Sequence, residues 1–180
     1  RVDHDSSHRV FMNRTNQDRN FTQVYIDRTA SATEDQLDSS GESAVNNDTI
    51  RITSLDMQRL RNLLDKPDLM QQKPYLLELE REIDRAIVVQ SSEVPPDTIT
   101  MNSTVQLIDL QTGEEMILTL VYPEDANIAE GRVSVLAPVG LAILGCHEGE
   151  QVEWEVPDGI RSLKVDRVLY QPEAAGEYAL

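Results

Sequence analysis

The sequence predicts an α+β fold, in which a short antiparallel helical hairpin precedes an antiparallel sheet with one short helix. Two apolar stripes of helical spacing, joined by a short connection, predict the hairpin within residues 49–90. Apolar residues that alternate at period two around Thr112 and Gly113 predict strands within residues 91–180. A chain of 180 residues is long enough to bury a core without disulfide bonds or metal ions.

Residues 1–48 have the composition of a flexible N-terminal extension. Asn, Ser, Thr and Asp are scattered through this segment, which contains no proline and a single glycine, Gly41. Its apolar clusters, around Phe11 and Tyr25, are small. They cannot repay the conformational entropy of ordering the segment, which costs about 1 to 2 kcal/mol per residue. We therefore expect a flexible extension before residue 49.

Two helices are expected after this segment. Thr53 and Asp56 form a capping-box pattern, which predicts that the first helix begins there. Pro67 forbids a longer helix, and Pro74 is well placed as the first residue of a second one. The apolar stripes are Met57, Leu60 and Leu64 in the first helix, and Leu76, Leu79, Ile83 and Ala86 in the second. Each stripe is expected to pack against the other.

A boundary and a sheet follow the second helix. Pro95 and Pro96 end the helical region, because neither can donate a backbone hydrogen bond. Beyond them, a β-hairpin is predicted from Val105 to Tyr122, with its turn at Thr112 and Gly113. Further strands are expected at 133–136, 152–156 and 162–169, and a short helix at 138–144. A helix of that length forms only by packing on the sheet.

The composition excludes several kinds of function. With 32 acidic and 16 basic residues, the net charge is −16, which repels nucleic-acid backbones and favours basic protein partners. One cysteine, Cys146, cannot form an intramolecular disulfide. The longest apolar run, Val135–Gly145, is about half the length of a membrane span. We expect a cytoplasmic protein that contacts no membrane and reaches nucleic acid only through a partner.

Several motifs resemble the C-terminal domain of the bacterial Gre transcript-cleavage factors. In order along the chain, they are Thr100–Ser103, Leu107–Glu114, Leu120–Pro123 and Val133–Gly145. The ending Tyr170–Tyr178 resembles more narrowly the Rnk family, the regulators of nucleoside diphosphate kinase. The likeness covers about residues 49–180. It implies an FKBP-like domain in residues 91–180 with the helical hairpin of residues 49–90 in front of it.

Resemblance to the Gre factors implies binding to RNA polymerase at the rim of its secondary channel. In these factors the loop before the short helix touches the rim, and the matching positions here are Leu136, Ala137 and Pro138. Ala137 stands where Gre factors have serine, so one hydrogen-bonding group is missing at this contact. The alternative is that Leu136 belongs to the core and that Pro138 only starts the helix.

The tip of the hairpin offers two carboxylates, Asp65 and Asp68. Gre factors cleave RNA with two acidic residues at the tip of a long coiled coil, where they help to hold a second magnesium ion that activates water. The first helix here, from about Leu55 to Asp65, reaches only roughly 16 Å, and Lys66 lies between the two acids. Asp65 is equally explained by the helix end and Asp68 by the turn.

The short arm predicts a protein without catalytic residues, which binds RNA polymerase and competes with Gre-type factors. Resemblance to Rnk implies the same role. Three alternatives remain at this point. The chain could cleave transcripts through Asp65 and Asp68, or act as a prolyl isomerase, although residues 91–180 contain no Phe for an aromatic pocket. It could also bind nucleoside diphosphate kinase, as the family name suggests.

No cofactor or metal ion is expected. Neither a phosphate-binding glycine loop nor a metalloprotease motif occurs in the sequence. His4 and His8 lie in the extension and are weak metal candidates. Cys146 and His147 are adjacent, and neighbouring residues rarely direct both side chains at one reacting atom. We therefore expect an inert cysteine at a helix end.

Two further groups have a structural interpretation. An acidic run suggests a solvated strand face or, alternatively, a surface for basic polymerase residues. Its members are Glu148, Glu150, Glu153, Glu155 and Asp158. Trp154 and Tyr170 fall on predicted strands and are expected in the core, because aromatic side chains bury large areas.

Overall fold

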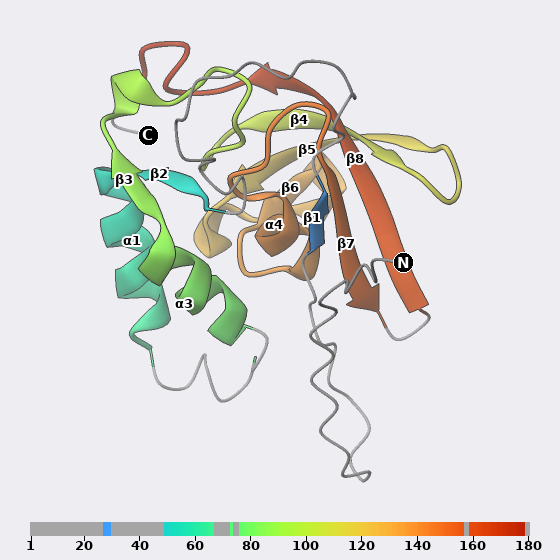
Figure 1. The fold of residues 1–180 in the computed structure, drawn as a ribbon, viewed down its shortest axis with the longest axis horizontal. Helices are drawn as coiled ribbons and strands as arrows, with labels where there is room; N and C mark the ends of the chain where they lie inside the picture. Colours follow the sequence, from blue (N-terminus) through green and yellow to red (C-terminus); the bar gives the residue numbers. More distant parts are fainter. Residues whose placement is uncertain (1–26, 30–48, 67–72, 74–75, 157–158, 179–180) are drawn as a thin grey trace, which may run out of the picture.

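The computed structural model describes residues 27–29, 49–66, 73, 76–156 and 159–178. These residues form two units that lie side by side (Figure 1). The sheet unit contains a six-stranded sheet and one short α-helix, and the hairpin unit, within residues 49–90, contains two helices and two short strands. The predicted α+β class is confirmed, and the sheet is mostly, though not entirely, antiparallel.

The large sheet has the strand order β1-β7-β8-β4-β5-β6. Its strands are β1 (Asp27–Thr29), β4 (Thr104–Asp109), β5 (Glu115–Val121), β6 (Arg132–Ser134), β7 (Gln151–Val156) and β8 (Gly159–Tyr170). All neighbours are antiparallel except β5 and β6, which run parallel. The expectation of a purely antiparallel sheet is therefore wrong at this edge. Between these strands, the short turns η2 (Pro123–Asp125) and η3 (Ile128–Glu130) carry the chain back to the level of Thr119, where β6 begins.

The predicted β-hairpin is confirmed by the pairing of Thr104–Ile108 with Glu115–Thr119. One Asp109 carboxylate oxygen accepts hydrogen bonds from the backbone N–H groups of Gln111 and Thr112, at 2.8 and 3.0 Å. Gly113 has a φ of 73°, a left-handed conformation that glycine adopts without steric cost. Local side-chain chemistry therefore closes this turn, and it sets the register of the two strands.

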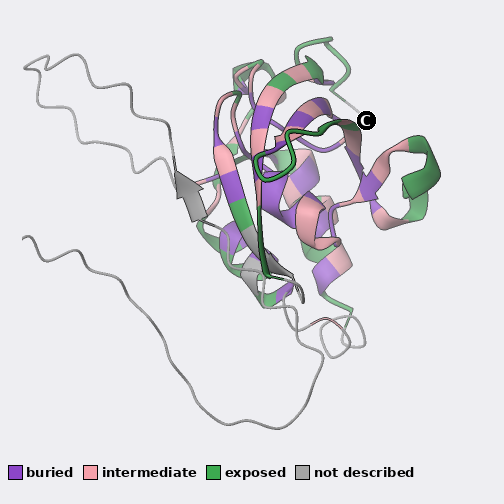
Figure 2. Cartoon of the chain, turned by 90° about the vertical axis from the view of Figure 1, so that its right-hand side faces the viewer, coloured by how far each residue is buried: buried purple, intermediate pink, exposed green. Residues whose placement is uncertain are grey.

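The helix α4 (Pro138–Ile143) lies on one face of the sheet and packs against β6 and β7 (Figure 1). Gly140 allows this close approach, because a Cβ atom at this position would lie 2.2 Å from the backbone oxygen of Ser134. The side chains of Leu141 and Ile143 are buried in a core that also includes Leu107 and Leu163 from the sheet. In Figure 2, buried and less buried positions alternate along the strands, as a half-buried sheet requires.

The hairpin unit consists of β2 (Arg51–Thr53), α1 (Ser54–Leu64), α3 (Leu76–Arg85) and β3 (Ile87–Val89). Thr53 Oγ1 accepts a hydrogen bond from the Asp56 N–H at 3.1 Å, which confirms the predicted start of the first helix. From β2, α1 runs to the connection between the helices, and α3 returns from it to β3 (Figure 1). The predicted stripe residues Leu60, Leu64, Leu76, Leu79 and Ile83 are all buried.

The second helix is shorter than the apolar pattern predicts, because it ends at Arg85 and leaves Ala86 outside. Ile87, Val88 and Val89 follow, and these β-branched residues form β3, which pairs in parallel with β2. Branching at Cβ restricts side-chain freedom in a helix and suits a strand. We call β2 and β3 together the neck, since they connect the helices to the rest of the chain.

Within the segment for which we expected only a flexible extension, Asp27–Thr29 form β1. This strand pairs antiparallel with β7, with Asp27 opposite Glu153 and Thr29 opposite Gln151. His4 and His8 lie outside the described residues. Among the helices of the described part of the chain, none is both long and apolar enough to cross a membrane.

Candidate functional site

The loop before α4, residues 134–138, contains the three positions that the Gre resemblance singles out. Ser134 Oγ accepts a hydrogen bond from the Leu136 N–H at 3.1 Å, and the Leu136 side chain is 4% exposed in the core. Ala137 is the N-cap of α4 and Pro138 is its first residue. Both are partly exposed. Leu136 therefore supports the loop from inside, and of the three singled-out positions Ala137 and Pro138 offer side-chain surface to a partner.

The tip of the hairpin begins at the end of α1. Asp65 is exposed, and its N–H donates a hydrogen bond to the Arg61 carbonyl at 3.0 Å, so this residue caps the helix. Asp68 lies outside the described residues. With 11 residues in α1 and 10 in α3, the helices are about 16 and 15 Å long at 1.5 Å per residue. The first helix is as short as the sequence predicts.

A buried polar contact joins the hairpin unit to the sheet unit. The Tyr122 hydroxyl, at the end of β5, donates a hydrogen bond to Asp56 Oδ1 on α1 at 2.7 Å. Asp56 is 4% exposed and Tyr122 is 8% exposed. The Arg59 guanidinium lies 5.6 Å from the centre of the Tyr122 ring, within range of a cation–π interaction. Asp56 therefore has two functions, since its N–H caps α1 and its carboxylate reaches across to the sheet.

The electrostatics of this contact follow from its burial. Burial raises the pKa of the Asp56 carboxyl, while hydrogen bonds from Tyr122 and Thr53 and the charge of Arg59 lower it by less. Burial and the nearby Asp56 charge raise the pKa of the Tyr122 hydroxyl well above its ordinary value. Tyr122 therefore keeps its proton at physiological pH and acts as the donor.

A second, partly buried acid lies near this contact. Glu173, in the C-terminal segment, accepts a hydrogen bond from the Thr100 hydroxyl at 2.7 Å, and Thr100 also bonds the Ser103 hydroxyl at 3.0 Å. Burial raises the pKa of the Glu173 carboxyl, and the Asp56 charge raises it further. Glu173 thus places the segment after β8 close to the Tyr122–Asp56 contact, which we call the junction.

A groove of about 730 Å³ opens beside the junction, between α1 and η2. Its lining residues are Arg59, Asn62, Leu63, Lys66, Asn102, Tyr122, Glu124 and Asp125. One wall is basic, through Arg59 of α1 and Lys66 just after that helix, and the wall from η2 is acidic, through Glu124 and Asp125. Asp125 also pairs with Arg132, at 3.5 Å. The volume lies within the range of small-molecule sites, but the mixed charge favours no single class of ligand.

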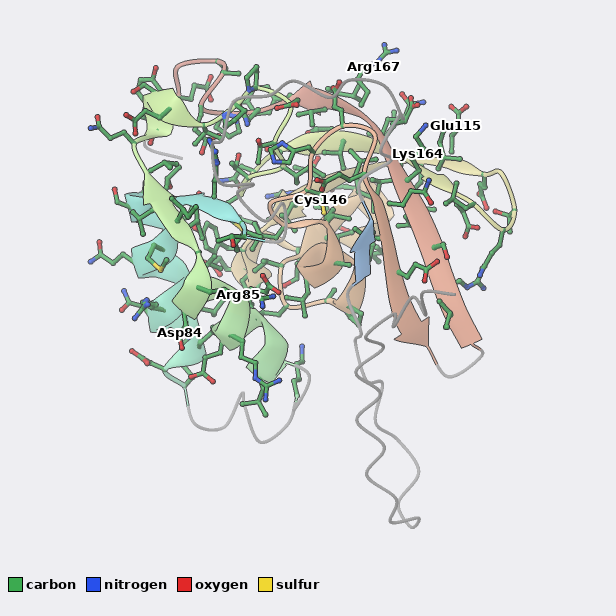
Figure 3. All side chains as sticks on the ribbon, in the orientation of Figure 1. Asp84, Arg85, Glu115, Cys146, Lys164 and Arg167 are labelled. Atoms are coloured by element: carbon green, nitrogen blue, oxygen red, sulfur yellow. The ribbon has the colours of Figure 1, made fainter. Side chains whose placement is uncertain are left out.

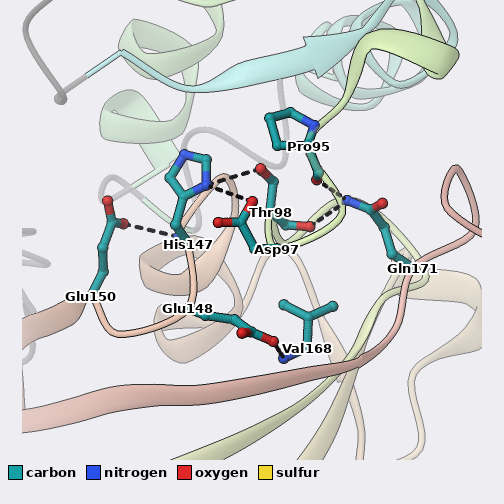
Figure 4. A network of polar contacts seen from close by, with 8 residues as sticks. All are labelled: Pro95, Asp97, Thr98, His147, Glu148, Glu150, Val168 and Gln171. Atoms are coloured by element: carbon teal, nitrogen blue, oxygen red, sulfur yellow. Dashed lines mark hydrogen bonds and ion pairs between the residues drawn. The ribbon is translucent and has the colours of Figure 1, made fainter.

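Cys146 and His147 do not form a reactive pair. The Cys146 thiol is fully buried beside α4 (Figure 3) and donates to the Ala142 carbonyl at 3.3 Å. His147 Nδ1 instead faces the Thr98 hydroxyl at 3.0 Å and an Asp97 carboxylate oxygen at 3.5 Å (Figure 4). The two side chains serve separate contacts, so the adjacency in sequence carries no chemistry between them.

The acidic run contributes to the fold in a way that neither sequence interpretation anticipated. Glu148 accepts a hydrogen bond from the Val168 N–H at 2.7 Å, and Glu150 accepts one from the His147 N–H at 3.1 Å (Figure 4). Glu153 accepts from the Ser162 hydroxyl at 2.9 Å. Asp158 and the side chain of Glu155 lie outside the described residues. The first members of the run therefore fasten the turn before β7 and the neighbouring strand.

The aromatic expectations have a mixed outcome. Tyr170 is 36% exposed rather than buried, because it lies at the end of β8, where its hydroxyl donates to Glu177 at 2.6 Å. The side chain of Trp154 lies outside the described residues. Tyr122, which the sequence marked only as a strand residue, is the aromatic residue at the junction. Its partner Asp56 is 66 positions away, and no local pattern connects the two.

The described residues contain no group of three or more His, Cys, Asp or Glu side chains arranged to hold a metal ion. What they do define is a two-part protein with a short helical arm, a junction with a buried acid, and a loop that starts α4.

Comparison with known proteins first identifies the class of protein to which this arrangement belongs. A family model described as "Transcription elongation factor, GreA/GreB, C-term" matches residues 94–170. The solved structure of a prokaryotic transcription elongation factor GreA/GreB from Nitrosomonas europaea is 41% identical, with a TM-score of 0.59, and the match covers 68% of this chain and 98% of that one. Transcription elongation factor GreA of Sulfurovum sp. (strain NBC37-1) is 32% identical over 112 residues, 62% of this chain and 68% of that protein. The fold is therefore that of the Gre-related factors.

The hairpin unit narrows the assignment. A family model described as "Rnk N-terminus" matches residues 48–89. The regulator of nucleoside diphosphate kinase of Escherichia coli (strain K12) is 42% identical over 133 residues, which are 73% of this chain and 97% of that protein. The chain belongs to the Rnk family.

Proposed function

We propose that this protein is a non-catalytic transcription regulator that binds RNA polymerase at the rim of the secondary channel and competes there with Gre-type factors. One observation carries the proposal: a sheet unit of Gre type is joined to an arm whose helices have only 11 and 10 residues. The sheet unit, FKBP-like by the resemblance, would dock on the rim. The arm would then occupy the entrance without reaching the reacting RNA. Such a protein acts in the cytoplasm, where the polymerase works.

The geometry of the tip favours blocking over cleavage. Asp65 lies at the end of α1, so the length of that helix limits what its carboxylate can reach. A carboxylate can help to hold a catalytic metal ion only if it is delivered to within bonding distance of that ion. An arm of about 16 Å ends well short of what the mechanism of the long coiled coil requires.

The loop before α4 is the proposed rim contact, through Ala137 and Pro138. Both side chains are partly exposed, while Leu136 and Gly140 fix the loop from below. A loop held in this way is preorganised, so little conformational entropy is lost on binding.

The test is a competition assay with RNA polymerase core, a labelled Gre factor and increasing amounts of this protein. RNA cleavage in stalled complexes is measured in the same samples. We expect displacement of the Gre factor together with loss of cleavage. Displacement with cleavage retained would instead assign Asp65 and Asp68 a catalytic role, and absence of displacement would overturn the proposal.

A matched pair of variants locates the contact. Ala137→Glu places a charge on the loop before α4, and Ala174→Glu places the same charge at an exposed position in the C-terminal segment. We expect at least tenfold weaker displacement for Ala137→Glu, because a charge buried in a contact without a partner is costly. Ala174→Glu should compete like the parent protein. Equal competition by both variants would move the contact away from this loop.

A second candidate partner is nucleoside diphosphate kinase. The observation that favours it is the 42% identity to a protein named as a regulator of that kinase. Titration of a labelled sample of this protein with the kinase, in parallel with the polymerase, separates the two. Binding to the kinase alone would make the second candidate the function.

A further inference from the structure

The hairpin unit and the sheet unit meet through contacts of two kinds. Apolar contacts include Ile50 of the hairpin unit, whose side chain lies so close to Gly145 that a Cβ there would be 2.6 Å from its Cγ2 atom. The polar contact is the hydrogen bond from Tyr122 to Asp56, with Arg59 over the tyrosine ring. Hydrophobic contacts tolerate rotation, because the hydrophobic effect has no direction. A hydrogen bond weakens steeply away from its preferred angle.

The position of this bond gives it leverage over the arm. Asp56 is in the first turn of α1, immediately after the neck, while the helix continues to Leu64 and the tip. Tyr122 is anchored in the sheet unit between β5 and η2, and Val135 donates its N–H to the Val121 carbonyl beside it at 2.9 Å. A rotation about the neck that strains the Tyr122–Asp56 bond moves the end of α1 farther than it moves Asp56, because that end lies farther from the neck.

Breaking this hydrogen bond while both side chains stay buried also costs free energy. Both side chains are almost fully removed from water, and a buried carboxylate without its donor carries the cost of its lost hydration. The orientation that keeps the bond is therefore favoured over orientations that break it but leave Asp56 buried.

We propose that Asp56 and Tyr122 are positioning residues that set the direction of the hairpin relative to the sheet unit. The functional consequence of this inference rests on the proposed function, because the direction of the hairpin decides where its tip lies once the loop before α4 is docked on the polymerase. The geometry itself is a property of the free protein. It can be tested without any partner.

The first experiment measures the interunit distance in the free, full-length protein. Spin labels at Gln58 of α1 and Glu114 of the β4–β5 turn, both exposed, report this distance by double electron–electron resonance in a Cys146→Ala background. We expect one narrow distribution for the parent and a broadened or displaced one for Tyr122→Phe. An unchanged narrow distribution for Tyr122→Phe would overturn the inference.

Two further variants separate positioning from general destabilisation. Asp56→Asn keeps an acceptor for the Tyr122 hydroxyl and should retain the narrow distribution. Tyr170→Phe removes a hydroxyl that also donates to a carboxylate, that of Glu177 at 2.6 Å, but this contact does not involve the hairpin unit. It should leave the distance unchanged. Broadening in Asp56→Asn or in Tyr170→Phe equal to that in Tyr122→Phe would count against a specific positioning role.

The second experiment repeats the competition assay with the same variants. If only a fraction of the molecules hold the arm in the binding orientation, the apparent affinity is the full affinity multiplied by that fraction. We expect about tenfold weaker displacement by Tyr122→Phe, with Asp56→Asn and Tyr170→Phe close to the parent. Failure of the parent itself to displace the Gre factor would refute the proposed function, whereas unchanged distances and unchanged competition in Tyr122→Phe would refute only the positioning role.

Discussion

The sheet unit and the hairpin unit are stabilised in different ways. In the sheet unit, each of the four inner strands has a hydrogen-bonded neighbour on both sides, and the core combines residues that are distant in sequence. In the hairpin unit, each helix contributes one buried stripe, and the neck pairs only three residues with three. Isolated helices of this length are marginal in water. The stability of the hairpin unit therefore depends on a few side chains and on its attachment to the sheet unit. The stability of the sheet unit depends on many contacts.

The largest expected effect breaks the hairpin and spares the sheet. Leu79→Asp places a charge where the side chain is 0% exposed, and we expect a loss of several kcal/mol from the stability of the hairpin unit. Amide hydrogen exchange should show lost protection in α1 and α3 with protection of β4 and β8 retained.

The matched control is Leu77→Asp on the same helix, where the side chain is 47% exposed. It should change stability by about 0.5 kcal/mol or less. If both variants lost helical protection equally, burial of the stripe would not explain the stability of the hairpin.

The next effect tests the attachment between the units. Gly145→Ala forces a Cβ to within 2.6 Å of Ile50 at a φ of 79°, and we expect a loss of about 2 to 4 kcal/mol from strain and overpacking. Gly149→Ala shares the positive φ, at 88°, but meets no atom within 4 Å. It should lose only about 1 to 2 kcal/mol. Urea unfolding measures the stability of both variants. Equal losses would show that the close approach to Ile50 does not contribute to the destabilisation.

A smaller effect concerns pH at the junction. Burial raises the pKa of Asp56 in the folded state above its value in the unfolded chain, so folding favours the protonated carboxyl. This contribution to stability is present below the unfolded pKa and is lost as pH rises through the folded pKa. We expect the parent to gain stability relative to Asp56→Asn as pH is lowered from neutral toward about 4.

Urea midpoints of both proteins across this range check the sign of the change. Glu173 is present in both proteins, and its pKa is raised by burial and further by the Asp56 charge, so the difference between them reports Asp56 together with its coupling to Glu173. A parent that gained stability relative to Asp56→Asn with rising pH would contradict the assignment.

The smallest effect belongs to the exposed ion pair across the two helices. Arg61 and Asp84 approach to 3.3 Å, and both side chains are more than half exposed. Figure 3 shows Asp84 on the hairpin unit. We expect Asp84→Asn to change the free energy of unfolding by about 0.5 kcal/mol or less, because solvent screens the pair. A loss above about 1 kcal/mol in low salt would show that the hairpin depends on surface charge as well as on its stripe.

The sequence predicted the parts of the fold that depend on local chemistry. The cap at Thr53, the apolar stripes and the turn at Gly113 all depend on residues within a few positions of each other, and all are present. The strand β3 was missed because three β-branched residues directly after a helix can extend that helix or form a strand. The choice was made by β2, some 35 positions earlier in the chain.

The junction shows why contacts within a site are harder to predict from the sequence than local structure. Asp56 was recognised as a helix-capping residue, but its carboxylate bonds Tyr122, and only the folded sheet brings the two together. Exposure could not be predicted either. Leu136 and Pro138 are only two positions apart, but the first is buried in the core and the second is partly exposed.

The lengths of the edge strands bear on how the protein behaves at high concentration. Both edges of the six-stranded sheet, β1 and β6, are strands of only three residues. An edge that short offers few free backbone groups on which another chain could build a further strand. Together with a net charge of −16, it opposes the ordered stacking of sheets that leads to fibrils. The sheet that leads into the loop before α4, the proposed rim contact, is thus protected against its own aggregation.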